Sequence, residues 1–242
     1  MKKIYLFLTC CFIFSVFQIS AQYDGYRKPV RIGFDAAMGF ANQWGNAYDA
    51  YGKTGLFCGA VGIDVDINFK ERSFIEIGTN FKRKGCRIEG HEWIDNVISN
   101  GGPFELRTKD KTVANLLYIQ IPILYGVELP IENNVAWKFM VGPYFSIGVA
   151  GDRRNTFKHI YEGRLETVSS FSDDHDYGYR RFDFGSKIST GVEVGKVSYL
   201  VSYELGLVNT IKQGRLWDTD VRGDFDYKAR NNGILFIISF RF

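Results

Sequence analysis

The residues that could do chemistry in this 242-residue chain fall into three groups: ionisable side chains, the two cysteines that follow the N-terminal apolar run, and a few histidines and serines. The ionisable groups are the largest set, and they alternate with apolar residues. Such period-two alternation is typical of strands with one polar and one apolar face. We therefore expect these charges to share one side of a sheet. They are Arg31, Asp35, Asp64, Asp66, Glu76, Lys82, Lys84, Glu128, Lys138, Arg181, Asp183, Lys187, Glu193, Glu204 and Arg241.

The signs of these charges almost balance, which allows two interpretations. An open lumen lined by them would be an ion-selective pore. A narrow lumen would instead be filled by mutually paired charges, because buried charges need partners. Eight strands leave room for side chains or at most one small ligand. The sequence therefore favours a lumen charge network over a pore.

Cys58 and Cys86 flank a tight turn near residue 72. A hairpin whose paired residue numbers sum to 144 sets Ile63 opposite Phe81 and the two cysteines opposite each other. Directly opposed Cβ atoms lie about 4.5–5.5 Å apart, so a small adjustment would permit a disulfide. We predict a disulfide near the extracellular rim, and two reduced thiols are the alternative.

Three histidines lie in predicted loops, and none has a second histidine beside it: His91, His159 and His175. A metal site needs three or four convergent ligands, so we predict no metal and no cofactor. A lipid-modifying enzyme would need His159 or His175 beside a serine such as Ser169, Ser170 or Ser172. The chain has no Gly-x-Ser-x-Gly elbow, and we predict no catalysis.

Eight stretches of the chain alternate with period two and are predicted strands. Their approximate ranges are 29–41, 56–69, 73–87, 114–129, 135–150, 180–194, 197–209 and 233–242. The connections after the second, fourth and sixth strands are tight, and the others are long. Short turns on one rim and long loops on the other are typical of outer-membrane barrels. Most strands also reach the roughly 9–11 residues that span a bilayer when tilted.

The apolar face of these strands is bulky, in a chain with 21 Phe and 14 Tyr, whereas the polar face carries charges and glycines. The two faces cancel in the mean hydropathy of −0.14. We predict that the apolar face meets lipid. The fold is then all-β, an eight-stranded antiparallel up-and-down transmembrane β-barrel in the outer membrane. The alternative is a soluble periplasmic lipocalin-like binder or β-sandwich, with the apolar face inside.

The two ends of the chain carry export signals. Lys2 and Lys3 precede an apolar run and the small pair Ser20-Ala21, so residues 1–21 are a predicted signal peptide and residues 22–242 the barrel. The run is shorter than the roughly 20 residues of a membrane helix. Phe240 and Phe242 look like a signal read by the barrel assembly machinery; a simple final strand is the alternative.

The stretch Tyr118–Leu124 resembles the "Y-x-x-I-P-L" strand of the small outer-membrane β-barrels of Bacteroidota, the PorT-like family. The glycine-rich strands 31–40 and 141–148 and the terminal Phe-Arg-Phe are similar to that family too. The resemblance implies an eight-stranded outer-membrane barrel and no catalytic residue. One member of the family takes part in a protein-secretion system, which adds a secretion accessory role to the alternatives.

A role through extracellular loops is therefore the predicted function, structural or interactive, for a monomeric barrel. The long loop at 151–179 and Trp93 and Trp217 on other loops are candidate contacts. Outer-membrane lipid, lipopolysaccharide and a protein at the loops are the expected partners. The net charge of +3 is too small to predict nucleic-acid binding. A lipid-modifying enzyme and a small-solute channel remain alternatives.

Overall fold

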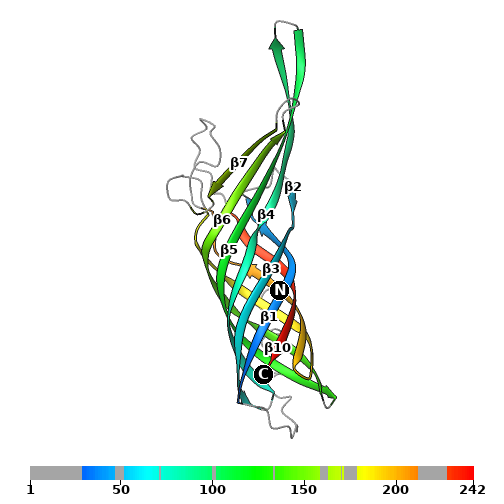
Figure 1. The fold of residues 1–242 in the computed structure, drawn as a ribbon, viewed down its shortest axis with the longest axis vertical. Coiled ribbons are helices and arrows are strands. Elements are labelled where there is room, and N and C mark those ends of the chain that lie inside the picture. The colour runs from blue at the N-terminus through cyan, green and yellow to red at the C-terminus, as the bar shows by residue number, and fades with distance from the viewer. Residues whose placement is uncertain are drawn as a thin grey trace, which may run out of the picture.

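The fold is a closed ring of strands, seen in a computed structural model of the chain (Figure 1). The structure describes residues 29–46, 52–70, 72–99, 102–132, 134–158, 163–169, 171, 179–211 and 228–242. The long strands are β1 (Val30–Trp44), β3 (Leu56–Lys70), β4 (Ser73–Ser99), β5 (Gly102–Glu132), β6 (Val135–Lys158), β8 (Phe182–Val194), β9 (Val197–Gly206) and β10 (Arg230–Arg241). Two short strands, β2 (Gly52–Thr54) and β7 (Gly163–Ser169), pair with β4 and β6.

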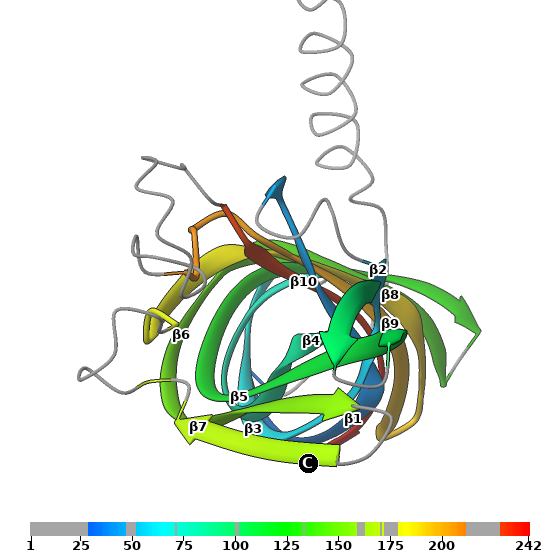
Figure 2. The ribbon, with the colours of Figure 1, turned by 90° about the horizontal axis from the view of Figure 1, so that it is seen from above.

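Every pairing in the ring is antiparallel, and the first and last strands pair with each other. The order is β4-β3-β1-β10-β9-β8-β6-β5, and the pairing of β5 with β4 closes the circle. Figure 2 shows this ring along the barrel axis. Because each strand has two neighbours, the ring leaves no unpaired sheet edge around the barrel. The predicted eight-stranded antiparallel barrel is confirmed.

The apolar face of the strands points outward, and the charged face points inward. Ile63 and Val201 are about half exposed, at 50% and 52%, whereas Lys138 is fully buried at 0%. This distribution contradicts the soluble alternative, in which the apolar face fills the centre. No helix in the described part of the chain has both the length and the apolar character needed to cross a membrane.

One rim carries three tight turns and both described ends of the chain, as the alternating loop lengths predict. The turn from β8 to β9 consists of Gly195 and Lys196, and Gly195 has a φ of +61°. That left-handed conformation suits glycine and the sharp reversal between the strands. Beside it, Phe242 N–H donates to the carbonyl of Ile32 at 2.9 Å, so the end of the chain is fixed to β1.

The register of β3 against β4 differs from the prediction by two residues. Ile63 lies opposite Thr79, and Phe81 lies opposite Val61. The turn closes between Lys70 and Ser73, with an irregularity after Asn68. The turn is therefore one residue tighter than predicted. A shift of two residues keeps every side chain on its predicted face.

The predicted ends of the third, fourth and fifth strands, at 87, 114 and 150, are wrong. β4 and β5 pair as far as Ser99 and Gly102, and this hairpin rises well beyond the ring at the top of Figure 1. β6 continues to Lys158 and pairs with β7. These extensions leave the bilayer, where strands need no apolar face. The polar sequence at 105–112 therefore shows no alternation.

We predict that a cation on the outer wall is costly only where the wall meets hydrocarbon. Ile123→Arg in the middle of β5 should lower the free energy of unfolding in lipid vesicles by about 2–4 kcal/mol. Ile131→Arg, near the short-turn rim of the same strand, should cost about 1 kcal/mol or less. Urea titration of both variants measures the difference. Equal losses at the two positions would contradict a lipid-facing wall.

Candidate functional site

The lumen near the short-turn rim holds a network of ion pairs, here called the lower network. Arg31 reaches three carboxylates, at 2.7 Å from Glu128, 2.8 Å from Glu193 and 3.0 Å from Asp66. The Lys138 ammonium lies among the same three, at 3.1 Å from Glu193, 3.5 Å from Glu128 and 3.6 Å from Asp66. Two cations thus share three acids, in a site from which the barrel wall excludes bulk water.

The lower network continues through Arg241, the penultimate residue of the chain. Its guanidinium pairs with Asp64, with Glu76 at 2.9 Å and with Asp66 at 3.4 Å. The ligand atoms of these three acids lie within 4.8 Å of one another, close enough to hold a metal ion. Because Arg241 contacts all three, the protein itself supplies the positive charge at this cluster.

The lower network takes at least one side chain from each of the eight ring strands. β9 contributes Ser198, whose hydroxyl donates to Glu193 at 3.1 Å. The other members come from β1, β3, β4, β5, β6, β8 and β10. Arg31 and Arg241 both pair with Asp66. The lower network therefore joins residues that are 210 positions apart in the sequence.

A second group of polar side chains, here called the upper chain, runs from the middle of the lumen toward the long-loop end. Lys82 pairs with Glu204 at 2.5 Å, and Gln120 donates to the same carboxylate at 2.9 Å. Lys84 pairs with Asp183 at 2.8 Å and donates to Ser146 at 3.2 Å. Its ammonium also lies 4.2 Å from the ring centroid of Tyr144, which adds a cation–π contact.

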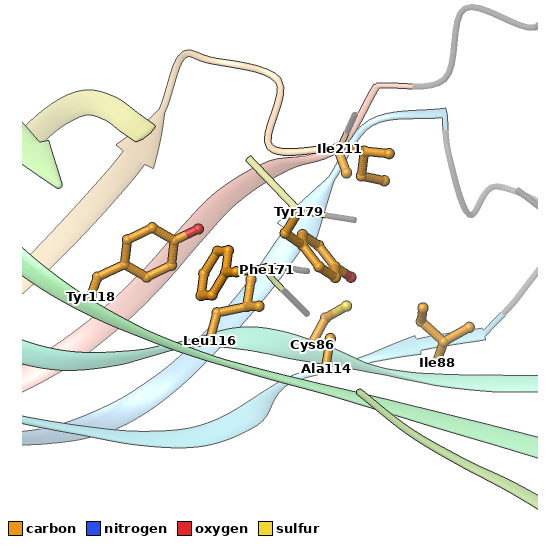
Figure 3. Packing of buried hydrophobic residues seen from close by; sticks show 9 residues of the cluster. Cys86, Ile88, Ala114, Leu116, Tyr118, Phe171, Tyr179 and Ile211 are labelled. Carbon is orange, nitrogen blue, oxygen red and sulfur yellow. The ribbon is translucent and has the colours of Figure 1, made fainter. Parts of the chain in front are cut away.

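Apolar side chains from the long-loop end close the lumen above the upper chain. Figure 3 shows Phe171 beside Tyr118, and their ring centroids lie 5.8 Å apart in an edge-to-face contact. Tyr179 and Ile211 pack in the same cluster, together with Leu116 of β5. We call this cluster the apolar plug. Phe171, Tyr179 and Ile211 belong to connections between strands, so the loop bases themselves fill the mouth.

The cavities beside the upper chain are small. Two cavities of about 10 Å³ each lie along the upper chain, and both are lined by Lys82 and Glu204. A cavity needs about 10–15 Å³ to hold one water molecule. Each cavity is thus the size of a single water at most. The described side chains around these two cavities are therefore closely packed.

The structure places most of the predicted lumen residues together, buried and facing the axis. Asp35 and Lys187 line one of the small cavities beside the Lys82–Glu204 pair. Arg181 differs: its side chain is exposed and lies at the rim, where it donates to the carbonyls of Gly148 and Phe171, each at 3.3 Å. Sequence alternation assigned Arg181 to the correct face, but it does not show where a strand leaves the barrel.

Sequence reasoning missed the apolar plug and the uncharged members of the lumen. Gln43 donates to Asn231 at 3.1 Å, and Asn231 donates to Asp183 at 3.1 Å. Both amides are buried on the polar faces of their strands, where alternation alone could have indicated them. The sequence feature that could have indicated the apolar plug is Phe171, a single aromatic residue in an otherwise polar loop.

The predicted disulfide between Cys58 and Cys86 is not present. In the observed register Cys58 lies opposite Gly39 of β1, and Cys86 opposite Ala114 of β5. Both cysteines are buried, and the two sulfur atoms are not joined. Cys86 Sγ donates to Gln43 Oε1 at 3.2 Å, as a thiol does.

Several predicted residues lie outside the described part of the chain or have undescribed side chains. These are the signal peptide at 1–21, His91, His159, His175, Ser169, Ser170, Ser172, Trp93 and Trp217. Phe240 and Phe242 are described: both are exposed on the outer wall, and their rings meet edge to face with centroids 4.9 Å apart.

A closed ring with an apolar wall and a charged centre defines the class of transmembrane β-barrels of outer membranes. The sequence matches the family described as outer membrane protein beta-barrel domain over residues 21–212, and the chain belongs to that family. The protein is therefore a protein of the cell outer membrane. A comparison with curated protein sequences found no match.

Among solved structures, the chain is similar to the attachment invasion locus protein Ail of Yersinia pestis, solved with the heparin analogue sucrose octasulfate. The sequences are 11% identical, the match covers 89% of this chain and 100% of Ail, and the TM-score is 0.37. Neisserial surface protein A is 9% identical, with 89% and 98% covered and a TM-score of 0.37. The translocator domain of NalP from Neisseria meningitidis is 10% identical, with 90% of each chain covered and a TM-score of 0.28.

We predict that removing one charge from the lower network destabilises the barrel strongly. Lys138→Met leaves Asp66, Glu128 and Glu193 with one cation fewer. Breaking such a buried cluster costs about 3–5 kcal/mol. Lys196→Met, in the exposed turn between β8 and β9, is the matched control and should change stability by less than about 0.5 kcal/mol. Urea unfolding in detergent measures both. Equal effects would contradict the network.

We also predict that both cysteines are reduced and shielded in the folded protein. Iodoacetamide should label neither thiol in the native barrel, because both are buried. After denaturation without a reductant it should label both. Mass spectrometry counts the labels. A denatured, unreduced protein without label would show a disulfide and contradict the observed register.

Proposed function

We propose that the protein is a non-enzymatic outer-membrane barrel that acts at the cell surface through its long-loop end. The observation that carries this proposal is the contrast between a filled lumen and an extended outer hairpin. Ion pairs and the apolar plug occupy the interior, where a channel would need a path. β4 and β5 are far longer than the roughly 9–11 residues that cross a bilayer.

The β4–β5 hairpin is suited to contact with a partner because its backbone is paired on both sides of an irregularity between Glu89 and Glu92. Beyond the last pairing with β6, at Lys109, it continues from Trp93 to Ser99 against Gly102 to Thr108. Seven residues at about 3.4 Å each extend it by about 24 Å beyond the barrel wall. A paired ribbon loses less conformational entropy on binding than a flexible loop of equal length.

We also propose a family subgroup, an assembly signal and an oligomeric state for the barrel. The strand around Pro122 supports a place among the PorT-like barrels of Bacteroidota. Phe240 and Phe242, exposed on the last strand, support recognition by the barrel assembly machinery. A ring without open edges supports a monomer. The signal peptide at 1–21 and lipopolysaccharide as a neighbour are proposed with them.

The first test measures current across planar lipid bilayers that contain the purified barrel. The proposal predicts no unitary conductance steps, because the lower network and the plug close the lumen. Reproducible single-channel currents would make the protein a channel and overturn the proposal. Lipid A from cells with and without the gene should be identical in mass, since no modification is proposed.

The second test maps contacts of the hairpin on intact cells. A photoreactive residue in place of Phe104, near the hairpin tip, should give a crosslinked adduct of defined mass. The same residue in place of Lys196, at the opposite rim, should not give that adduct. Replacing residues 93–108 by Asn-Gly, between the paired Glu92 and Lys109, should leave the barrel folded and abolish binding. Unchanged binding by this variant would contradict the proposal.

A further inference from the structure

One strip of the outer wall is charged instead of apolar, at the long-loop end of β4, β5 and β6. Charged and polar residues replace part of the apolar face there, at once on β4 and more gradually on β5 and β6. Phe81, Ile119 and Ile147 form the last rung that is bulky and apolar on all three strands. Arg83 shares the next rung with Leu117 and Ala150, Asn115 and Asp152 lie in the rung above it, Arg87 and Arg154 flank Val113 in the third, and Lys111 is exposed above them. The described side chains of this strip include four cations and one acid.

Polar contacts join the side chains of this strip to one another. Arg83 donates to the Asn115 side-chain oxygen, and the Asn115 amide donates to Asp152 at 3.4 Å. Arg154 pairs with the same Asp152 carboxylate at 2.7 Å, and its side chain remains 59% exposed. Asn115 and Asp152 thus set the positions of two guanidinium groups. A guanidinium carries five N–H donors, so each retains donors for a ligand.

The wall is hollowed between these two arginines. The register of β5 against β6 shifts between Leu117 and Tyr118, so that Tyr118 lies opposite Gly148 and Leu117 opposite Ala150. The small residues Ala150 and Gly151 leave a hollow of about 520 Å³, which Arg83, Leu117, Asp152 and Arg154 also line. One side of this hollow is therefore apolar, and the other side presents cations.

The height of the strip relative to the membrane indicates the chemistry of the ligand. Arg83 lies one outward position above Phe81, which is about 7 Å along the strand. The headgroup layer extends about 5–8 Å beyond the hydrocarbon on each side of a bilayer. The Arg83 end of the hollow is then at the level of the lipid headgroups on the long-loop side. Phosphate is the headgroup anion that paired N–H donors of arginine bind best.

We propose that this hollow binds the phosphate of a phosphorylated glycolipid in the outer leaflet. Arg83 and Arg154 bind the phosphate, and the acyl chains continue down the apolar wall below it. The inference goes beyond the proposed function, because it concerns the lipid-facing wall and not the loops. It does not depend on the identity of any partner of the hairpin.

The experiment is native mass spectrometry of the folded, delipidated full-length protein released from detergent. The ligands are a bis-phosphorylated lipid A, the same lipid without phosphates, and inorganic phosphate alone. The variant Arg83→Gln/Arg154→Gln removes both cations from the hollow. Its matched control, Lys70→Gln/Lys196→Gln, removes two exposed cations from the short-turn rim. Heat-modifiable migration on a gel checks that each variant is folded.

The proposal predicts that the hollow variant binds phosphorylated lipid A at least tenfold more weakly than the original protein. The control variant should stay within about twofold. The dephosphorylated lipid should bind both proteins equally and weakly, and inorganic phosphate alone should not bind at lipid concentrations. Equal affinity of the hollow variant and the original would overturn the proposal. Saturation by inorganic phosphate alone would overturn the lipid assignment and make the hollow a site for free anions.

Discussion

The burial of charge in a narrow lumen is the constraint on which the rest of this barrel depends. An isolated ionised group costs several kcal/mol when it leaves water, and its partner offsets that cost only in good geometry. Lys138 is 0% exposed, so its neighbours Asp66, Glu128 and Glu193 must come to it from three other strands. Each of these strands is then held in one register, because a slip would separate charges that water cannot reach.

The same constraint explains how a narrow cylinder accommodates long side chains. Arg241 crosses the lumen against Gly33, where any side chain would collide with its guanidinium. Phe74 lies against Gly126 in the same way, and the Lys138 ammonium lies 4.7 Å from its ring centroid. At these two positions a glycine on one strand leaves room for a large or charged side chain on its neighbour. The polar faces of the strands therefore combine small residues with large ones.

The fold was largely predictable from the sequence because one face of each strand meets lipid. Alternation determines which face a residue such as Ile77 or Glu76 occupies, and loop lengths determine the rim. Alternation does not determine register. Asp66 lies directly opposite Glu76, a pairing of like charges that cross-strand rules disfavour. Arg241, on β10, contacts both carboxylates. A residue of a third strand thus stabilises the observed register, although the sequences of β3 and β4 alone suggested a different register.

The candidate site was predictable only where it lies inside the bilayer. Above it, both faces of β4, β5 and β6 carry polar residues, so neither the extended hairpin nor the hollow beside Arg83 has a periodic signature. The apolar plug depends on Phe171 and Tyr179, which lie between strands and follow no alternation at all. The parts of the molecule that we propose to meet partners are thus the parts whose sequence is least constrained by the membrane.

The most direct test of the central claim is an accessibility scan along β9 in a cysteine-free variant. Nitroxide labels are placed one at a time from Ser198 to Glu204, and collisions with oxygen and with a water-soluble nickel chelate are measured in lipid bilayers. The account predicts oxygen maxima at Tyr199, Val201 and Tyr203, and access for neither reagent at the positions between them. Chelate access at Ser198 or Ser202 would show a water-filled lumen, and oxygen maxima there would show an apolar centre; either result would contradict the account.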